Sequence, residues 1–255
     1  MGWSPDRYLR FADHRMRPGL ELLARIPDLE ATSIFDLGCG PGTVTRHVAE
    51  RWPMARTVGV DSSPEMIARA RTDHPDLEWV EADIATWVPD EPVDVIFSNA
   101  TLHWLDHHGR LFPRLFDFLR PGGVLAVQMP NNWSAPTHTI PAGVLAGPGW
   151  SEAQRRLLIS DRVDDATDYR RYLIDHAASL DLWQTTYYQE LTGDDPVFEW
   201  TSGSLLGPVL SALGDEDRTR FVDAVIAGYR ETYPPDHTGT VLVPFTRLFI
   251  VAVRA

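Results

Sequence analysis

The sequence holds a single cysteine, Cys39, so no disulfide can form within the chain. It contains no apolar run that approaches the roughly 18 residues of a membrane-spanning helix. Its first residues lack the basic region and apolar stretch of a secretory signal, and Gly2 is not followed by a myristoylation signal. We therefore expect a protein that is not bound to membranes and that resides in the cytoplasm.

Clusters of basic residues are missing as well. The chain carries 23 Lys and Arg residues against 36 Asp and Glu residues, which gives a formal net charge of −13. Nucleic-acid binding needs a basic surface that neutralises phosphates, so the composition excludes nucleic acid as an expected partner. With 255 residues, 44% of them hydrophobic, the chain can bury the core of one sizeable α/β domain with an elaboration, or of two small domains.

A strand, a glycine-rich turn and a helix are predicted early in the chain. Ile34–Leu37 is a short β-favouring run, and helical spacing of apolar residues begins at Thr43. Between them lie Gly38, Gly40 and Gly42. Glycine lets the main chain adopt torsions that other residues avoid and approach a ligand closely. We therefore expect this turn to bind a ligand through main-chain atoms.

The charge beside the turn indicates which ligand it binds. A dinucleotide-binding turn reads G-x-G-x-x-G and holds a pyrophosphate at a helix N-terminus. Here Thr43 stands in place of the third glycine, and the carboxylate of Asp36 would repel a pyrophosphate. S-adenosylmethionine carries an ammonium and a sulfonium group but no phosphate, so it suits this turn better than a nicotinamide dinucleotide does. The alternative is an ordinary α/β turn in which Asp36 is incidental.

Acidic residues also follow the next two predicted strands. Asp61 follows Thr57–Val60 and lies about 20 residues after the glycines, where an acid in nucleotide-binding βαβ units accepts hydrogen bonds from ribose hydroxyls. Asp83 and Ile84 follow Leu77–Val80. Asp83 can accept a hydrogen bond from the amine of an adenine whose ring Ile84 covers. Acids at three successive strand ends strengthen the prediction of S-adenosylmethionine.

The alternation of strands and helices continues through the first half of the chain. Pro18 is expected to open a helix, and Ser62 or Ser63 to cap a helix whose buried face includes Met66. The run from Val93 ends in a strand terminus at Asn99, a helix is expected over 111–119, and 124–129 is a strand of the buried parallel kind. This pattern predicts an α/β protein with a parallel sheet.

The second half is less regular. Four prolines from Pro130 to Pro148 predict a loop-rich connection rather than a long helix. Tyr169–Leu180 is expected to be helical, Leu182–Tyr188 to be a strand, and two helical patterns follow between 196 and 233. Thr246–Val253 is a further strand with no long crossover before it, which predicts an antiparallel last strand.

These residues resemble two nested families. The cofactor motif resembles class I S-adenosylmethionine-dependent methyltransferases through Asp36–Gly42, Asp61, Glu81–Asp83 and the strand end at Asn99. Other segments are similar to the trans-aconitate 2-methyltransferase family in particular, and the match spans nearly the whole chain: Trp3–Leu9, Arg15–Pro18, Gln128–Trp133, Pro136–His138, Trp183–Tyr188 and Arg247–Ala252. The chain departs from the pattern in Ile140–Asp165, which is richer in proline and glycine.

The resemblance implies a Rossmann-like class I methyltransferase fold. It has a mostly parallel seven-stranded sheet with an antiparallel last strand, and a helical cap or insertion. A single domain, residues 1–255, would comprise an N-terminal arm and helix over the site (1–30), a cofactor-binding core (31–130), substrate-side loops with a helical insertion and one sheet strand (131–240), and the last strand (241–255). The sequence sets no expectation for the oligomeric state.

The resemblance also implies the activity and the site. S-adenosylmethionine would donate a methyl group to a carboxylate of trans-aconitate, a tricarboxylic acid, and leave as S-adenosylhomocysteine. The expected cofactor-binding residues are Asp36, Gly38, Gly40, Asp61, Ser62, Met66, Asp83, Ile84, Asn99, His103 and Trp104. The expected substrate-binding residues are Tyr8, Arg15, Arg17, Trp133, His138, Tyr187, Tyr188 and Arg247, because arginine binds carboxylates through a planar fork.

Methyl transfer to a carboxylate requires neither a catalytic base nor a metal ion. A carboxylate with an ordinary pKa near 4 is ionised at pH 7, so no residue has to deprotonate it and we expect no catalytic acid or base. His103 and His107 are spaced like helical metal ligands, but they have no third candidate nearby, and we expect no metal site.

Three alternatives remain open from the sequence. The chain could methylate another small acid or nucleophile, it could be a non-catalytic module that binds S-adenosylmethionine, or it could be a nicotinamide-dependent dehydrogenase. Asp36 and the missing third glycine count against the dehydrogenase. The aromatic and cationic N-terminal arm counts against a bare sensor.

Overall fold

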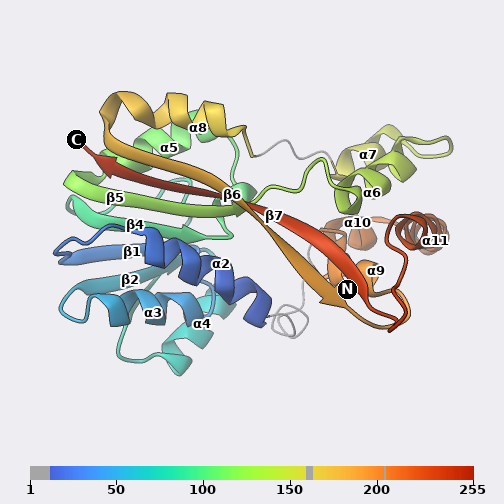
Figure 1. Ribbon diagram of the computed structural model, residues 1–255, viewed down its shortest axis with the longest axis horizontal. Coiled ribbons are helices and arrows are strands. Elements are labelled where there is room, and N and C mark those ends of the chain that lie inside the picture. The colour runs from blue at the N-terminus through green and yellow to red at the C-terminus, as the bar shows by residue number, and fades with distance from the viewer. Residues whose placement is uncertain (1–11, 159–162, 204) are drawn as a thin grey trace. The chain divides into compact units, whose positions relative to one another are not determined.

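The structure is a computed structural model that describes residues 12–158, 163–203 and 205–255, with the side chains of 12–15 outside the description. A seven-stranded sheet runs in the order β3-β2-β1-β4-β5-β7-β6 (Figure 1). Its strands are β1 (Ser33–Leu37), β2 (Arg56–Asp61), β3 (Glu78–Glu81), β4 (Val93–Asn99), β5 (Leu119–Pro130), β6 (Ala177–Leu191) and β7 (Val241–Arg254).

The register confirms the predicted class of fold. Strands β1 to β5 pair in parallel, and β7 pairs with β5 in the antiparallel direction. The α-helices are α2 (Ala12–Arg25), α3 (Thr43–Arg51), α4 (Pro64–Asp73), α5 (His108–Asp117), α6 (Pro136–Ala146), α7 (Glu152–Arg155), α8 (Ala166–Leu173), α9 (Pro196–Ser202), α10 (Gly207–Ala212) and α11 (Asp215–Thr232). Short 3₁₀ segments are η1 (Leu102–Trp104), η2 (Arg156–Leu158) and η3 (Ile174–His176).

The chain divides into two compact units that interleave along the sequence. The sheet unit consists of Arg15–Pro130, Arg162–Thr185 and Arg247–Ala255, and the helical unit includes Asn131–Asp161 and Thr186–Thr246. Strands β6 and β7 contribute residues to both units. The expectation that the whole chain forms a single domain stays a prediction.

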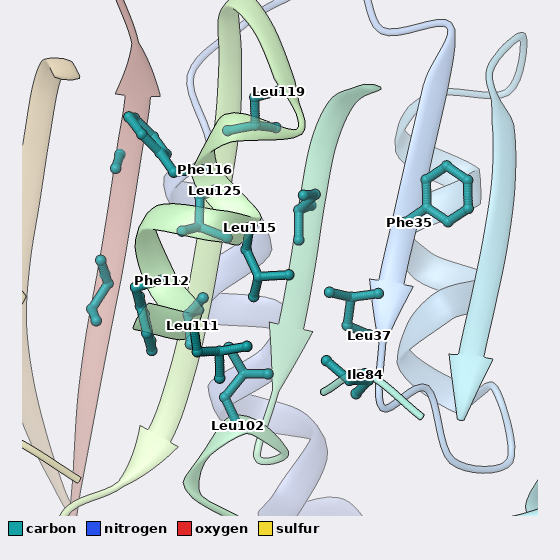
Figure 2. Packing of buried hydrophobic residues seen from close by; sticks show 14 of the residues in the cluster. Phe35, Leu37, Ile84, Leu102, Leu111, Phe112, Leu115, Phe116, Leu119 and Leu125 are labelled. Atoms are coloured by element: carbon teal, nitrogen blue, oxygen red, sulfur yellow. The ribbon is translucent and has the colours of Figure 1, made fainter. Parts of the chain in front are cut away.

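One face of the sheet in the sheet unit is covered by α5 and α8. Alternate residues of the strands point to this face and form a large apolar cluster with Phe112, Phe116 and Tyr169. Figure 2 shows side chains of α5, such as Leu115, in the same layer as Leu37 of β1 and Leu125 of β5. Buried on both faces, these strands carry the near-continuous apolar runs expected of a parallel sheet.

The opposite face carries α2, α3 and α4. A Cβ on Gly19 of α2 would lie 3.2 Å from the Cγ of Asn99 on β4, which shows how closely α2 packs there. The indole of Trp79 fills the space over β2, because a Cβ on Gly59 or on Gly42 would come within 2.4 Å of its ring. This face therefore has small residues where helices and loops approach the strands.

The helical unit has its own apolar core, built from α6, α9, α10, α11 and the adjoining parts of β6 and β7. Helices α6 and α11 pack tightly, since a Cβ on Gly228 would lie 2.7 Å from the Cγ2 of Ile140. The hydroxyl of Tyr229 donates to the carbonyl of Thr137 at 2.7 Å and satisfies a buried carbonyl there. No helix in the described ranges of either unit combines the length and hydropathy that a bilayer crossing requires.

Three predicted elements differ from the structure. Pro18 lies inside α2 instead of opening it, because its ring removes a single helical hydrogen bond while Leu22 and Leu23 of the same helix are buried. The proline-rich segment forms the eleven-residue helix α6. Pro136 stands in its first turn, where no N–H is needed, and Pro148 follows its end. Pro141 lies inside the helix on its buried face, in line with Thr137 and Leu145.

The third difference concerns the segment after Tyr169. Helix α8 ends at Leu173, and β6 begins at Ala177, so the predicted helix over Tyr169–Leu180 is too long. Leu180 and Leu182 are two residues apart and pack against the apolar cluster of the sheet unit, which is the period of a strand. The predicted helix was too long because the first apolar residues of β6 fall at positions that also fit the helical spacing of α8.

A buried polar pair joins α5 to α8. The Nε2 of His108 lies 2.9 Å from the carbonyl of Leu102, which can only accept, so Nε2 carries the proton of the neutral ring. The Nδ1 of His108 then accepts from the hydroxyl of Tyr169 at 2.6 Å. Burial lowers the pKa of His108, which keeps the ring neutral, and it raises the pKa of Tyr169.

We expect Tyr169→Phe to lower the free energy of unfolding by about 1–3 kcal/mol, because it leaves the buried Nδ1 of His108 without a donor. The measurement is urea unfolding followed by tryptophan fluorescence at pH 7.5. Tyr172→Phe is the control, since that hydroxyl donates to Asp164 at 2.9 Å in a partly exposed position, and its loss should cost less. Equal unfolding midpoints for wild type and Tyr169→Phe would contradict the assignment.

Candidate active site

The glycine turn after β1 is fixed by packing on two sides. Gly38, Gly40 and Gly42 have φ angles of 77°, 55° and 86°, a region in which side chains other than glycine are strained. A Cβ on Gly38 would lie 2.0 Å from the Cγ2 of Thr101, and one on Gly42 would lie 2.4 Å from Trp79. At Gly38 and Gly42, a side chain is therefore excluded both by the positive φ angle and by contact with a neighbouring side chain.

Gly40 differs from its two neighbours because it faces open space. No described residue places an atom within 4 Å of where its Cβ would be. Its N–H donates to the Oδ2 of Asp61 at 2.9 Å, which holds the middle of the turn against the end of β2. The turn thus presents a bare and immobilised main chain, which is the cradle expected for a ligand bound through its backbone.

Asp61 has capacity for a ligand beyond the bonds it makes. Its Oδ1 accepts from the N–H of Ser63 at 2.9 Å, and its Oδ2 accepts from Gly40. A carboxylate has about four acceptor positions, so roughly two remain. Ser63 caps α4 through its hydroxyl, which accepts from the N–H of Met66, whereas the side chain of Ser62 is exposed at the same corner.

Asp36 is a buried carboxylate at the end of β1. Its side chain is 2% exposed, and its Oδ2 accepts from the hydroxyl of Thr45 in α3 at 2.6 Å. Desolvation raises its pKa from 3.8 to about 7; the charge of Asp61 also raises it, and the bond from Thr45 opposes the rise. A carboxylate in this position is stabilised by a cation placed beside it.

Asp83 and Ile84 follow β3 as predicted, with several local bonds. The Oδ1 of Asp83 accepts from the N–H of Ala85 at 2.8 Å and shapes the turn. The side chain of Ile84 is 6% exposed and belongs to the apolar cluster of the sheet unit, and its carbonyl accepts from Arg114 at 2.6 Å. The expectation that these two residues bind an adenine stays a prediction.

The end of β4 carries a further polar group. Asn99 is its last residue, and within the described part of the chain its buried Oδ1 has no hydrogen-bond partner. His103 and Trp104 follow in η1, where the ring centroids lie 4.7 Å apart, with His103 buried and Trp104 56% exposed. His107 lies beyond η1 with a φ of 61°, so it does not share a helical face with His103. Within the described ranges, no group of three His, Cys, Asp or Glu residues is arranged to hold a metal ion.

The register of the strands places five polar residues on the same face at one edge of the sheet. Residues paired across neighbouring strands, and residues two apart on one strand, point to the same face. Asp36 pairs with Gly59 and with Phe97, and Phe97 pairs with Ala126. Asp61 is two residues after Gly59 on β2, and Asn99 is two residues after Phe97 on β4. Asn99 pairs with Gln128 of β5, and Pro130, two residues after Gln128, lies opposite Arg247 of β7. These five residues form the polar row: Asp61, Asp36, Asn99, Gln128 and Arg247.

The polar row changes in charge from one end to the other. It begins with two carboxylates on β2 and β1, continues with two amides on β4 and β5, and ends with the guanidinium of Arg247 on β7. Arg247 is 6% exposed, and its Nη1 donates to the Oε1 of Gln128 at 3.3 Å. Gln128 was not among the sequence-predicted site residues, although a polar residue near the end of the predicted apolar strand 124–129 is a signal in the sequence.

Three further substrate candidates come from the N-terminal part of the chain. Tyr8 and the side chain of Arg15 lie outside the described residues. Arg17 is exposed on α2 and forms an ion pair with Glu21 at 2.8 Å. Of the two predicted arginines whose side chains are described, Arg247 is the one that lies in the polar row.

The helical unit holds four other substrate candidates. The rings of Trp133 and His138 meet edge to face with centroids 5.2 Å apart, and burial lowers the pKa of His138 to about 4. A neutral His138 cannot supply a positive charge to an acid at pH 7. Tyr187 is buried and Tyr188 is 62% exposed, as expected for successive residues of β6 that point to opposite faces.

A groove of about 620 Å³ lies at the opposite edge of the sheet, where β2 and β3 begin. It is bordered by Arg46, which pairs with Asp76 and Glu50, and by Arg56, which pairs with Glu78 at 2.7 Å. Both arginines thus already form ion pairs with carboxylates that border the same groove. The ligands of open parallel sheets bind at the carboxyl ends of the strands, and that edge carries the polar row.

Comparison with known proteins decides the family. A family model described as a methyltransferase domain matches residues 34–123. The chain is 45% identical over 253 residues to a trans-aconitate 2-methyltransferase of Azoarcus sp. strain BH72, with 99% of each chain covered. It is 42% identical over 252 residues to a protein of the same name from Shigella dysenteriae, covering 99% of this chain and 98% of that protein. The chain belongs to the trans-aconitate 2-methyltransferase family.

Solved structures agree with the fold. A phosphoethanolamine N-methyltransferase 2 of Haemonchus contortus, in complex with phosphomonomethylethanolamine and S-adenosylhomocysteine, has a TM-score of 0.55 at 16% identity and covers 93% of this chain and 52% of that one. The YcgJ protein of Bacillus subtilis has a TM-score of 0.58 at 12% identity, with 93% and 98% covered. This member of the trans-aconitate 2-methyltransferase family is therefore an S-adenosylmethionine-dependent methyltransferase with a Rossmann-like fold.

In this methyltransferase, Asp36→Asn should stabilise the cofactor-free protein most at high pH. The folded state holds the Asp36 proton more tightly than the unfolded state, because the pKa rises from 3.8 to about 7 on folding. The contribution of Asp36 to the free energy of unfolding is fully present below pH 3.8. It falls as the pH rises towards 7, by roughly 4 kcal/mol in all. Asparagine carries no charge to desolvate, so the variant should gain on the order of 1–4 kcal/mol over wild type at pH 8 and less at pH 5.

Denaturant unfolding at the two pH values measures this gain, and isothermal titration should show about tenfold weaker binding of S-adenosylmethionine. Asp73→Asn is the control, because Asp73 is an exposed carboxylate on α4 that pairs with Arg69 at 3.1 Å. A gain of the same size at pH 5 and pH 8 would show that Asp36 is not protonated in the folded protein at pH 5.

Proposed function

We propose that this enzyme transfers the methyl group of S-adenosylmethionine to a carboxylate of trans-aconitate. The observation that carries the proposal is the polar row, in which charge changes from acidic to cationic across neighbouring strands at one edge of the sheet. A cationic cofactor fits the acidic end, and a polyanionic acid fits the end at Arg247. The names of the relatives in Azoarcus and Shigella support the choice of acid.

The acidic end of the polar row fits the cofactor. The open space over Gly40 and the buried, unpartnered Oδ1 of Asn99 in the described part of the chain are features that a bound ligand would use. Asp36 would face the cationic part of S-adenosylmethionine, and the remaining acceptor positions of Asp61 would receive the ribose hydroxyls. When bound, the cofactor supplies an electrophilic methyl group on a positively charged sulfur.

The acceptor oxygen requires no activation by the protein. A carboxylate is ionised at pH 7, so the residues of the site have only to orient it and to exclude water. Attack converts a cation and an anion into two neutral groups at the reacting atoms, and such neutralisation proceeds more readily in a site of low dielectric.

The carboxylates that are not methylated must be held against the charge of the whole protein. The net charge of −13 repels a tricarboxylate, so local donors have to overcome the general field. Arg247 suits this role because a buried guanidinium presents a planar fork of N–H donors to a carboxylate. Arg15, Arg17, Tyr8, Trp133, Tyr187 and Tyr188 remain substrate candidates on the resemblance.

Purified enzyme with methyl-labelled S-adenosylmethionine and a panel of small carboxylic acids tests the activity. We expect label in a base-labile monomethyl ester of trans-aconitate and stoichiometric release of S-adenosylhomocysteine. Boiled enzyme and omission of the acid are the controls. Cofactor binding without label transfer to any acid would favour a binding module, and transfer to another acid alone would overturn the choice of trans-aconitate.

Arg247→Lys should chiefly raise KM for the acid. A contact with a carboxylate that is not methylated is made in both the ground state and the transition state, and lysine supplies a point charge without the fork. We expect KM for trans-aconitate to rise about tenfold, with KM for S-adenosylmethionine within about twofold.

Arg254→Lys is the matched control, because Arg254 lies near the other end of β7 and donates to the carbonyls of Phe116, Asp117 and Leu119. It should lower the melting temperature and leave KM for the acid unchanged. If Arg247→Lys behaves in the same way as Arg254→Lys, Arg247 is a structural residue.

A further inference from the structure

We propose that Gln128 binds the acid substrate directly, by donating from its Nε2 to a carboxylate that is not methylated. Gln128 is thereby a specificity-determining residue of the site, beside Arg247. This inference rests on the proposed function, and it adds a residue that neither the cofactor motif nor the predicted set of arginines contains.

Gln128 is a fully buried polar residue in a strand interior of the sheet. Its exposed fraction is 0%, and β5 lies between β4 and β7. It pairs in register with Asn99 on one side and with Phe249 on the other, so in the polar row it lies between Asn99 and Arg247. A glutamine among Val127, Met129 and other apolar residues of β5 is an exception that a structural role in the core does not require.

The hydrogen bond from Arg247 fixes the orientation of the amide. The guanidinium has donors and no acceptor, so the atom of Gln128 that faces it must be Oε1, at 3.3 Å from Nη1. The Nε2 is then directed away from Nη1. Within the described part of the chain, this buried Nε2 has no hydrogen-bond partner. Buried donors in native proteins are nearly always satisfied, so an acceptor is expected at this position when the site is filled.

The acceptor that fits is an anion. A carboxylate placed at the cationic end of the polar row would receive an N–H from the amide and lie beside the guanidinium of Arg247. Two carboxylates meet this description, one from the acid substrate and one from the methionine part of the cofactor. Gln128 is two strands from Asp36 and three from Asp61, or about 10 and 14 Å at the usual strand spacing. This distance from the cofactor end favours the substrate carboxylate.

Two substitutions test the donor without removing the volume of the side chain. Gln128→Met keeps the length and removes the amide, and Gln128→Glu replaces the donor with a negative charge that pairs with Arg247. We expect KM for trans-aconitate to rise about tenfold in Gln128→Met and further in Gln128→Glu, with KM for S-adenosylmethionine within about twofold. Binding of S-adenosylhomocysteine by isothermal titration should be unchanged in both variants.

The matched control is Thr57→Val. Thr57 is a buried polar residue of β2 at the opposite edge, 4% exposed, and its hydroxyl has no partner in the described part of the chain. Its substitution should change the melting temperature and leave both KM values as in wild type. Should Gln128→Glu fail to fold, Gln128→Met and Gln128→Asn supply the same test.

Substrate truncation identifies the carboxylate. Glutaconate, mesaconate and itaconate each lack one of the three carboxylates of trans-aconitate. If Nε2 binds a given carboxylate, the analogue without it should lose affinity in wild type, and Gln128→Met should cause no further loss with that analogue. The other two analogues should still lose about tenfold on substitution of Gln128.

Binding of tricarballylate, a saturated tricarboxylate, to the enzyme with S-adenosylhomocysteine separates this inference from the proposed function. Weaker tricarballylate binding in Gln128→Met supports the inference even if wild type fails to methylate trans-aconitate. Unchanged tricarballylate binding, or no binding by wild type, overturns it. A raised KM for S-adenosylmethionine with an unchanged KM for the acid assigns Nε2 to the cofactor carboxylate and also overturns it.

Discussion

Two-residue alternation along parallel strands is the constraint on which the site depends. Each strand of the sheet unit sends alternate side chains to the face covered by α5 and to the face covered by α2 and α3. Because β2, β1, β4 and β5 are paired in parallel, their last polar residues meet at one edge and on one face. A slip of one residue in any strand would turn its polar residue into the apolar cluster of the other face. The packing of the core therefore positions the polar row.

In the proposed function, the acidic end of the polar row lowers the folding stability of the empty protein and strengthens cofactor binding. Asp36 is kept in a dry position whose pKa of about 7 reflects the cost of its charge, and Thr45 recovers part of that cost. A bound cation would offset the remainder, so the same burial that destabilises the empty site strengthens the attraction for the cofactor. Gly40 serves the same end, since it leaves space over the turn while its N–H is fixed by Asp61.

In the proposed function, the cationic end of the polar row binds the acid and follows a different rule. A carboxylate nucleophile is supplied in its reactive state by the solution, so the protein contributes orientation and the exclusion of water. Buried donors are suited to this task, because an N–H that has lost its water binds an anion more strongly than an exposed one does. The strong negative charge of the whole chain makes such local donors more important for holding a polyanionic acid, and Arg247 places a buried cation beside Gln128.

The sequence by itself determined the strand–glycine turn–helix unit, the acids at successive strand ends, the cationic cofactor and the antiparallel last strand, because each depends on local torsions, charge or periodicity. It misjudged Pro18, Pro141 and the end of α8, since tertiary burial of one face outweighed the local preference of each segment. The tertiary structure alone decided the polar row. Gln128 and Arg247 are 119 residues apart, and no local pattern reports that β7 inserts beside β5 and brings a guanidinium against that amide. Long-range strand pairing fixes such contacts, and its register is set by the complete sheet.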